Sequence, residues 1–185
     1  MMKFLLLLCS ITLSGCATAQ TLTPFEKDVN HNTTPTYQEV IAFYEALAIN
    51  HTDIFQFKPY GKTDSGYPLH LGVLSQNGDF DVEKVKTDNK LVIFVNNAIH
   101  PGEPCGVDAT MMMTRDFLEK RKDHPLPEDV VIVFIPFYNI GGGLNRGGYS
   151  RANQVGPQAH GFRGNAKHLD LNRDFIKNDS KNAQT

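Results

Sequence analysis

Leu91-Val92-Ile93-Phe94-Val95 is an uninterrupted apolar run, and Val130-Val131-Ile132-Val133-Phe134-Ile135 is a second one that stops at Pro136. Such runs are typical of strands that are covered on both faces. Between them a helix is expected to begin near Pro104, because proline is favoured in a first turn and the apolar residues that follow recur at helical spacing. Strand, helix and strand in this order predict a βαβ unit with parallel pairing, and therefore an α/β fold.

Two further elements are expected upstream of this unit. Thr36 is suited to cap a helix, and the apolar residues after it recur at helical spacing: Tyr37, Val40, Ile41, Tyr44, Leu47 and Ala48. Residues 54–75 contain short β-type runs broken by turn residues, which predicts a hairpin. Residues 20–35 are polar, contain two prolines and show no period, so a tether is expected there.

Composition excludes several functional classes. The chain has 185 residues, and its 18 Lys and Arg against 20 Asp and Glu give a formal net charge of −2. This balance offers no basic surface for nucleic acid or for an anionic membrane. The apolar fraction of 41% is ordinary for a globular domain. No apolar stretch reaches the 18 or so residues that a transmembrane helix needs.

Residues 1–19 have the features of a secretory signal, with a positively charged start and an apolar core of about ten residues. Leu13-Ser14-Gly15-Cys16 resembles the lipobox of bacterial lipoproteins, which implies cleavage before Cys16 and a lipid on its sulfur. Cleavage after Ala19 would instead release a soluble protein. We expect an exported chain, periplasmic or anchored to the outer membrane, with secretion as the alternative. Only Cys105 then remains, and a small buried side chain is the expected role for it.

The segment after the first predicted strand carries the chemistry. Ligands of open α/β sheets bind just beyond the carboxyl ends of the strands, and His100-Pro101-Gly102-Glu103 occupies that position. Pro101 and Gly102 are suited to a tight turn that would let the imidazole and the carboxylate converge on one cation. This pair of side chains is a ligand set for zinc, and a catalytic zinc ion takes three protein ligands and a water.

These motifs resemble the zinc carboxypeptidase family. His100-Pro101-Gly102-Glu103 is similar to the family's first two zinc ligands. Asp170-Leu171-Asn172-Arg173-Asp174-Phe175 is similar to its Asn-Arg segment, which holds the free carboxylate of a peptide C-terminus, and Ser150-Arg151-Ala152-Asn153 to the segment whose arginine polarises the scissile carbonyl. The resemblance implies a three-layer αβα fold with a mixed, largely parallel sheet over residues 36–185.

The resemblance also implies roles for single residues. Zn²⁺ would be held by His100 and Glu103, and the substrate would be a peptide with a free C-terminal carboxylate. Arg173 supplies the planar, permanently charged fork that carboxylate recognition favours, and Asn172 can add a hydrogen bond. Arg151 would stabilise the developing oxyanion as the catalytic arginine. Arg146 and Arg163 compete with it for that role.

Two elements of the family pattern have no match in the chain. The family's third zinc ligand, a histidine, and its general base, a glutamate, lie beyond the Asn-Arg segment, whereas no glutamate follows Glu128. We therefore expect residues 36–185 to form part of such a catalytic domain, to bind zinc weakly and to be inactive alone. An uncovered apolar sheet edge and poor solubility are expected as well.

Three alternatives stay open. A same-fold zinc deacylase of small amino-acid derivatives would use the same His and Glu. A non-catalytic, exported lipoprotein could still capture carboxylates. A serine hydrolase is the third, because Gly148-Tyr149-Ser150-Arg151-Ala152 nearly fits the G-x-S-x-G pattern, although Ala152 replaces its last glycine.

Overall fold

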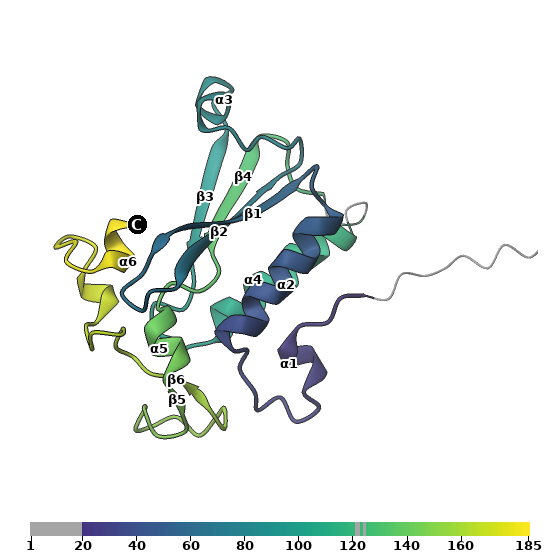
Figure 1. Ribbon diagram of the computed structural model, residues 1–185. Coiled ribbons are helices and arrows are strands. Elements are labelled where there is room, and N and C mark those ends of the chain that lie inside the picture. Colours follow the sequence, from purple (N-terminus) through teal and green to yellow (C-terminus); the bar gives the residue numbers. More distant parts are fainter. Residues whose placement is uncertain (1–19, 121–122, 124) are drawn as a thin grey trace, which may run out of the picture.

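The computed structural model describes residues 20–120, 123 and 125–185. The expected signal segment over residues 1–19, with its candidate lipidation site Cys16, lies outside the described residues. Four strands form one mixed sheet in the order β1-β2-β4-β3 (Figure 1). Their bounds are Phe55–Lys62 for β1, Pro68–Ser75 for β2, Leu91–Asn96 for β3 and Val130–Ile135 for β4.

The strand pairing confirms the α/β fold and the βαβ unit. β1 and β2 form the expected antiparallel hairpin, and β2 also pairs antiparallel with β4. β3 pairs parallel with β4, from Leu91 opposite Val130 to Asn96 opposite Ile135. Within the described residues, parallel pairing is confined to these two strands, which are the ones that flank the candidate site.

Two long helices, α2 (Tyr37–Asn50) and α4 (Cys105–Glu119), cover one face of the sheet (Figure 1). α2 begins at the expected residue, because the hydroxyl of Thr36 accepts a hydrogen bond from the Glu39 N–H and the Glu39 carboxylate accepts one from the Thr36 N–H. The core between helices and sheet is aromatic at its centre, where the rings of Tyr44 and Phe134 have centroids 5.0 Å apart. A smaller cluster lies on the other face of the sheet: Leu69, Ile135, Tyr138 and Leu171.

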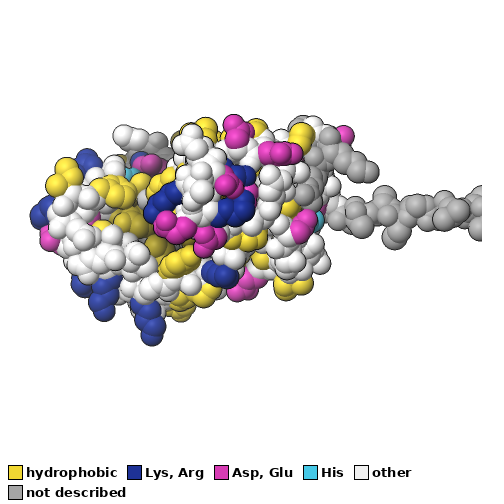
Figure 2. Space-filling model, turned by 90° about the horizontal axis from the view of Figure 1, so that it is seen from above, with side chains coloured by type: hydrophobic (Ala, Val, Ile, Leu, Met, Phe, Trp, Pro, Cys, Tyr) yellow, Lys and Arg dark blue, Asp and Glu magenta, His cyan; other side chains and the backbone are white. Residues whose placement is uncertain are grey.

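The remaining elements are short. They are α1 (Pro24–Lys27), α3 (Val82–Thr87), α5 (Ile140–Leu144), α6 (Lys181–Gln184), a 3₁₀ turn (Leu171–Arg173), and the two-residue strands β5 (Arg146–Gly147) and β6 (His160–Gly161). Seen from above, acidic and basic side chains alternate over the α3 end of the molecule (Figure 2). Among the described residues, no helix is both long and apolar enough to cross a bilayer.

The expectation that residues 91–95 are covered on both faces is wrong. β3 is an edge strand that pairs only with β4 in the described sheet, and four consecutive side chains are exposed: Leu91, Val92, Ile93 and Phe94. β4, which lies between β2 and β3, is mostly buried, as expected. An uninterrupted apolar run therefore predicts a strand but not whether other elements pack on its faces. A central strand and an apolar edge strand have the same local pattern.

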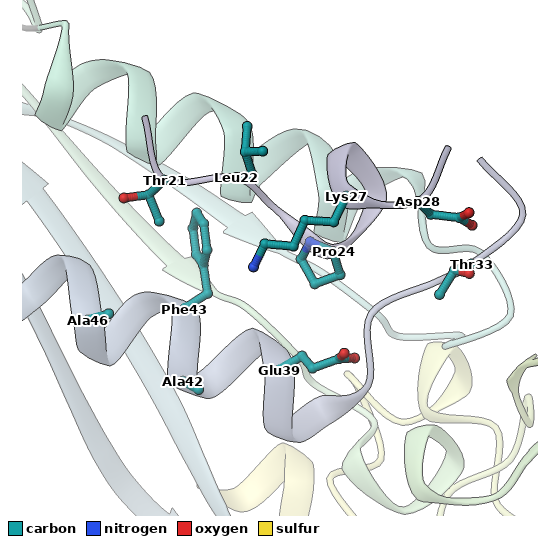
Figure 3. A pocket seen from close by; sticks show the side chains of 10 residues that line it. All are labelled: Thr21, Leu22, Pro24, Lys27, Asp28, Thr33, Glu39, Ala42, Phe43 and Ala46. Atoms are coloured by element: carbon teal, nitrogen blue, oxygen red, sulfur yellow. The ribbon is translucent and has the colours of Figure 1, made fainter. Parts of the chain in front are cut away.

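The segment over residues 20–35, for which we expected a tether, packs against the domain. Glu26 in α1 forms an ion pair of 2.5 Å with Arg115 of α4, whose side chain is only 2% exposed. Thr34 donates a hydrogen bond to the carbonyl of Ala159 at 3.1 Å. Figure 3 shows the cavity of about 570 Å³ that this segment forms with α2, where Phe43 and Lys27 point toward each other.

Candidate active site

The loops after β3 and β4 are joined at the carboxyl ends of these strands. The N–H of Tyr138 donates to the carbonyl of Asn97 at 2.9 Å, and the N–H of Asn139 donates to the carbonyl of Ala98 at 3.0 Å. Ala98 has a φ of 54°, in the left-handed region, where the chain turns out of β3. This edge of the sheet is where ligands bind in open α/β folds.

The side chain of Asn139 ties three segments together at this edge. It is fully buried, and its Nδ2 donates to the carbonyl of Ile99 at 3.2 Å and to that of Arg163 at 2.9 Å. Its Oδ1 accepts a hydrogen bond of 2.8 Å from the N–H of Gly142 in α5. One amide therefore fixes the backbone directly before His100 relative to the loop that carries Arg163.

His100 and Glu103 lie on a tight turn. The N–H of Glu103 donates to the carbonyl of His100 at 2.9 Å. A Cβ on Gly102 would lie 2.8 Å from the Cδ of Arg151 and 3.1 Å from the carbonyl oxygen of Gly161, so glycine is required by close approach. The turn brings Nδ1 of His100 to 3.5 Å from Oε1 of Glu103, with the imidazole buried and the carboxylate exposed.

Asp170 lies behind the imidazole. Its Oδ1 is 2.9 Å from Nε2 of His100, and its Oδ2 accepts a hydrogen bond of 3.0 Å from Nη2 of Arg163. The hydrogen bond to His100, supported by Arg163, lowers the pKa of Asp170 to about 2. An ionised carboxylate at Nε2 favours the tautomer with its proton on Nε2, which leaves the lone pair of Nδ1 facing Glu103.

Two of the three candidate arginines lie at the site. Nη1 of Arg151 is 2.7 Å from Oε1 of Glu103. Nη1 of Arg163 is 3.3 Å from Nδ1 of His100 and 3.9 Å from Oε1 of Glu103. Arg146 instead donates to backbone carbonyls and to the hydroxyl of Thr34, and no contact with His100 or Glu103 is recorded among the described residues. The guanidinium groups of Arg151 and Arg163 therefore place two positive charges beside the carboxylate of Glu103.

The Asn-Arg segment is only partly at the site. Asn172 lines a cavity of about 270 Å³ together with His100, Glu103 and Cys105. Arg173 is exposed, and its Nη1 donates to the carbonyl of Asn172 at 3.1 Å rather than lining that cavity. The structure therefore brings Asn172 beside the predicted ligands, while the guanidinium of Arg173 points elsewhere.

The separation of the two candidate donor atoms, on His100 and Glu103, fits a zinc ion. Two atoms on a tetrahedral zinc ion lie roughly 3.3 Å apart, given bonds of about 2.0–2.2 Å to nitrogen and oxygen. The 3.5 Å between Nδ1 of His100 and Oε1 of Glu103 is close to this separation. Asp170 occupies the other ring nitrogen, as second partners of metal-bound histidines commonly do. Within the described part of the chain, no group of three His, Cys, Asp or Glu side chains could hold a metal ion.

Sequence reasoning missed part of this site. The sequence assigns no role to Asp170, which lies inside the Asn-Arg segment, and offers Arg163 only as a rival to Arg151. The useful signal was an acid two residues before Asn172, since an imidazole that binds metal needs an acceptor for its other N–H. The expectation that Cys105 is buried is wrong, because the first residue of α4 faces the cavity and is exposed.

The serine of the rival G-x-S pattern does contact a histidine. The hydroxyl of Ser150 lies 3.0 Å from Nδ1 of His160 and 3.3 Å from the carbonyl oxygen of Gly161. His160 is 1% exposed, and its Nε2 has no hydrogen-bond partner in the described structure. A catalytic triad needs a group that orients the second ring nitrogen, so this pair lacks that part of the arrangement.

Comparisons with known proteins show a family and a fold. A model of the zinc carboxypeptidase family matches residues 40–185. A carboxypeptidase A from Helicoverpa armigera superposes with a TM-score of 0.53 at 18% identity, over 62% of this chain and 26% of that one. A metallo-carboxypeptidase from Burkholderia cenocepacia gives 0.56 at 17% identity, over 80% and 35%. The chain thus spans about a third or less of these structures, and no curated protein matches its sequence.

Proposed function

The chain belongs to the zinc carboxypeptidase family, and from this premise we propose that it takes part in removing C-terminal residues from peptides. The observation that carries the proposal is the convergence of His100 and Glu103 at 3.5 Å, with Asp170 bound to the far side of the imidazole. An imidazole and a carboxylate in this arrangement suit a zinc ion.

In this proposal each side chain has a defined task. His100 and Glu103 hold the zinc ion, which when bound lowers the pKa of a water molecule and polarises a carbonyl group. Arg151, 2.7 Å from Glu103, supplies a fixed positive donor for the charge that develops on the scissile carbonyl oxygen. Asn172, which lines the same cavity as the two ligands, donates a hydrogen bond to the terminal carboxylate of the peptide.

Arg173 requires a change of rotamer to take part. Its guanidinium is exposed and bound to a backbone carbonyl of its own segment. An exposed side chain reorients at little cost, so a peptide carboxylate can draw it toward Asn172 and form a two-pronged ion pair. In this proposal the ion pair between Arg173 and the peptide carboxylate forms only when the peptide binds.

The chain alone is expected to bind zinc weakly. Its described residues supply two donors, whereas catalytic zinc sites use three protein ligands. We also propose that the chain is exported, as a lipoprotein anchored through Cys16 or, failing that, as a soluble protein cleaved after Ala19. This rests on the sequence of residues 1–19 alone.

The proposal is tested by binding measurements on the 185-residue chain. Calorimetric titration with zinc should show weak binding that His100→Ala and Glu103→Gln abolish and His51→Ala leaves unchanged. A short peptide with a free C-terminal carboxylate should bind more tightly than the same peptide with a C-terminal amide. Zinc binding that survives both substitutions, or equal affinity for acid and amide, contradicts the proposal. Preference for a single N-acyl amino acid over a tripeptide would favour the deacylase instead.

A further inference from the structure

A second cavity, of about 590 Å³, adjoins the proposed zinc site. Glu103 and Cys105 line both this cavity and the smaller one that Asn172 lines. We call it the Met112 cavity and define it by six of its lining residues: Phe25, Pro104, Cys105, Ala109, Met112 and Pro157. The two cavities therefore adjoin at Glu103 and Cys105.

One wall of the Met112 cavity comes from the segment before α2. Phe25 and His31 lie ring against ring, with centroids 4.8 Å apart. The N–H of Gln158 donates to the carbonyl of Asn32 at 3.0 Å, which fastens this segment to the loop that carries Pro157. The family match begins at residue 40, so this wall lies outside the part of the chain that shows the family.

The other wall is the start of α4. Ala109 and Met112 are three residues apart, so they lie on the same side of the helix, and both line the cavity. The α1 segment is held against α4 by the ion pair between Glu26 and the buried Arg115. Both walls are therefore anchored by contacts that do not depend on a ligand.

The lining indicates what kind of group would fit. The six defining side chains are carbon-rich or carry sulfur, which suits an apolar group. The lining also includes polar side chains, namely His31, Thr33, Thr34 and Gln154. Its acidic groups are Glu103 and Asp108, and one oxygen of Asp108 is buried without a hydrogen-bond partner in the described structure. An anionic group would be repelled there.

We propose that the Met112 cavity binds an apolar side chain of the peptide substrate, on the N-terminal side of the bond that is cleaved. This rests on the proposed function, in which Asn172 marks the end that receives the terminal carboxylate. A peptide whose scissile carbonyl lies at His100 and Glu103 must continue away from Asn172. The Met112 cavity fits this requirement, because it adjoins the site at Glu103 and Cys105 and is not lined by Asn172.

Binding without zinc tests this, because no peptide is then hydrolysed. Four probes are titrated against the full chain: acetyl-Leu-Leu-Ala and acetyl-Ser-Ser-Ala, each with a free C-terminal acid and with an amide. The leucine acid should bind roughly 5- to 10-fold more tightly than the serine acid, as expected for partial burial of an apolar side chain. It should also slow alkylation of Cys105, followed by peptide mass spectrometry.

Ala109→Phe fills the cavity from an exposed helix position, and it should reduce the leucine preference to less than about 2-fold. Ala46→Phe makes the same change at an exposed position of α2, in the cavity of Figure 3, and should keep the preference. Equal affinity for the leucine and serine acids, with acids still preferred over amides, overturns this inference and leaves the proposed function standing. Equal affinity for acids and amides overturns the proposed function as well.

Discussion

Nε2 of His100 lies 2.9 Å from Oδ1 of Asp170, although 70 positions separate the two residues in the sequence. The contact joins the turn after β3 to the segment that carries Asn172. It fixes the ring orientation of His100, so that Nδ1 faces Glu103, and Arg163 holds Asp170 from the other side at 3.0 Å. The carboxylate is therefore a positioning residue for the proposed zinc ligand.

Asp170→Ala should lower zinc affinity by roughly 10- to 100-fold, the usual effect of losing a carboxylate behind a metal-bound histidine. The imidazole would lose its fixed orientation and part of its basicity. Isothermal titration calorimetry on the variant and on the unchanged chain measures the effect. Asp179→Ala, which removes an exposed carboxylate of the same segment, is the matched control. An unchanged zinc affinity in Asp170→Ala would exclude the positioning role.

Asn139→Ala should lower the free energy of unfolding by about 2–4 kcal/mol, because it leaves two carbonyls and one N–H without their buried partner. Urea unfolding followed by circular dichroism measures this. Asn145→Ala, at an exposed position at the end of α5, should change the value by less than about 0.5 kcal/mol. Equal effects of the two substitutions would mean that the three hydrogen bonds of the Asn139 side chain do not stabilise the fold.

Local patterns were sufficient for most secondary structure. Thr36 begins α2, residues 54–75 form the hairpin, and the two apolar runs are the parallel strands β3 and β4. In each case the information is periodic or lies within one turn, so neighbouring residues carry it. The His100 and Glu103 pair is also local, since Pro101 and Gly102 make the turn.

What the sequence did not predict depends on contacts between distant segments. The contact of Asp170 with His100 forms only when the chain folds. In the sequence, Arg115 has the pattern of a surface residue on an amphipathic helix, and its burial depends on the packing of Glu26 against it. The exposure of β3 was missed for a related reason. Whether a strand lies at the centre or at the edge of a sheet is decided by its neighbours, which its own residues do not specify.

Glu26→Ala should loosen α1 from α4, while the contacts of Asn32 and Thr34 still hold the end of the segment. Arg115, 2% exposed, would keep Asp116 as a partner but lose its charged hydrogen bond to Glu26, at an expected cost of about 2–3 kcal/mol. Trypsin should then cleave after Lys27 faster than in the unchanged chain, as followed by mass spectrometry. Glu45→Ala removes an exposed carboxylate from α2 and serves as the control. Identical cleavage rates in both variants would contradict the anchoring role.

The exposed edge of β3 should cause self-association. Val92 and Phe94 are 49% and 58% exposed on a strand whose outer edge has no partner in the described sheet, and such edges promote pairing between chains. Val92→Lys should reduce the apparent mass in light scattering at high protein concentration. Val29→Lys, which replaces an 88% exposed apolar residue away from the sheet, should not. A chain that stays monomeric without either substitution would disprove the prediction.

Asp79 should make the protein sensitive to acid. Hydrogen bonds from Lys84 and then Lys90 lower the pKa of this carboxyl to about 2, from about 3.9 in an unfolded chain. Because the folded state holds the charged form more strongly, the stabilisation is complete above about pH 4 and is lost as the pH falls through about 2. Asp79→Asn should therefore lower the urea midpoint at pH 7, and the difference from the unchanged chain should shrink toward pH 2. Asp129→Asn, which removes a carboxylate from an exposed position, should parallel the unchanged chain at every pH. If the gap between Asp79→Asn and the unchanged chain stays constant from pH 7 to pH 2, the lysines do not stabilise the charged form of Asp79.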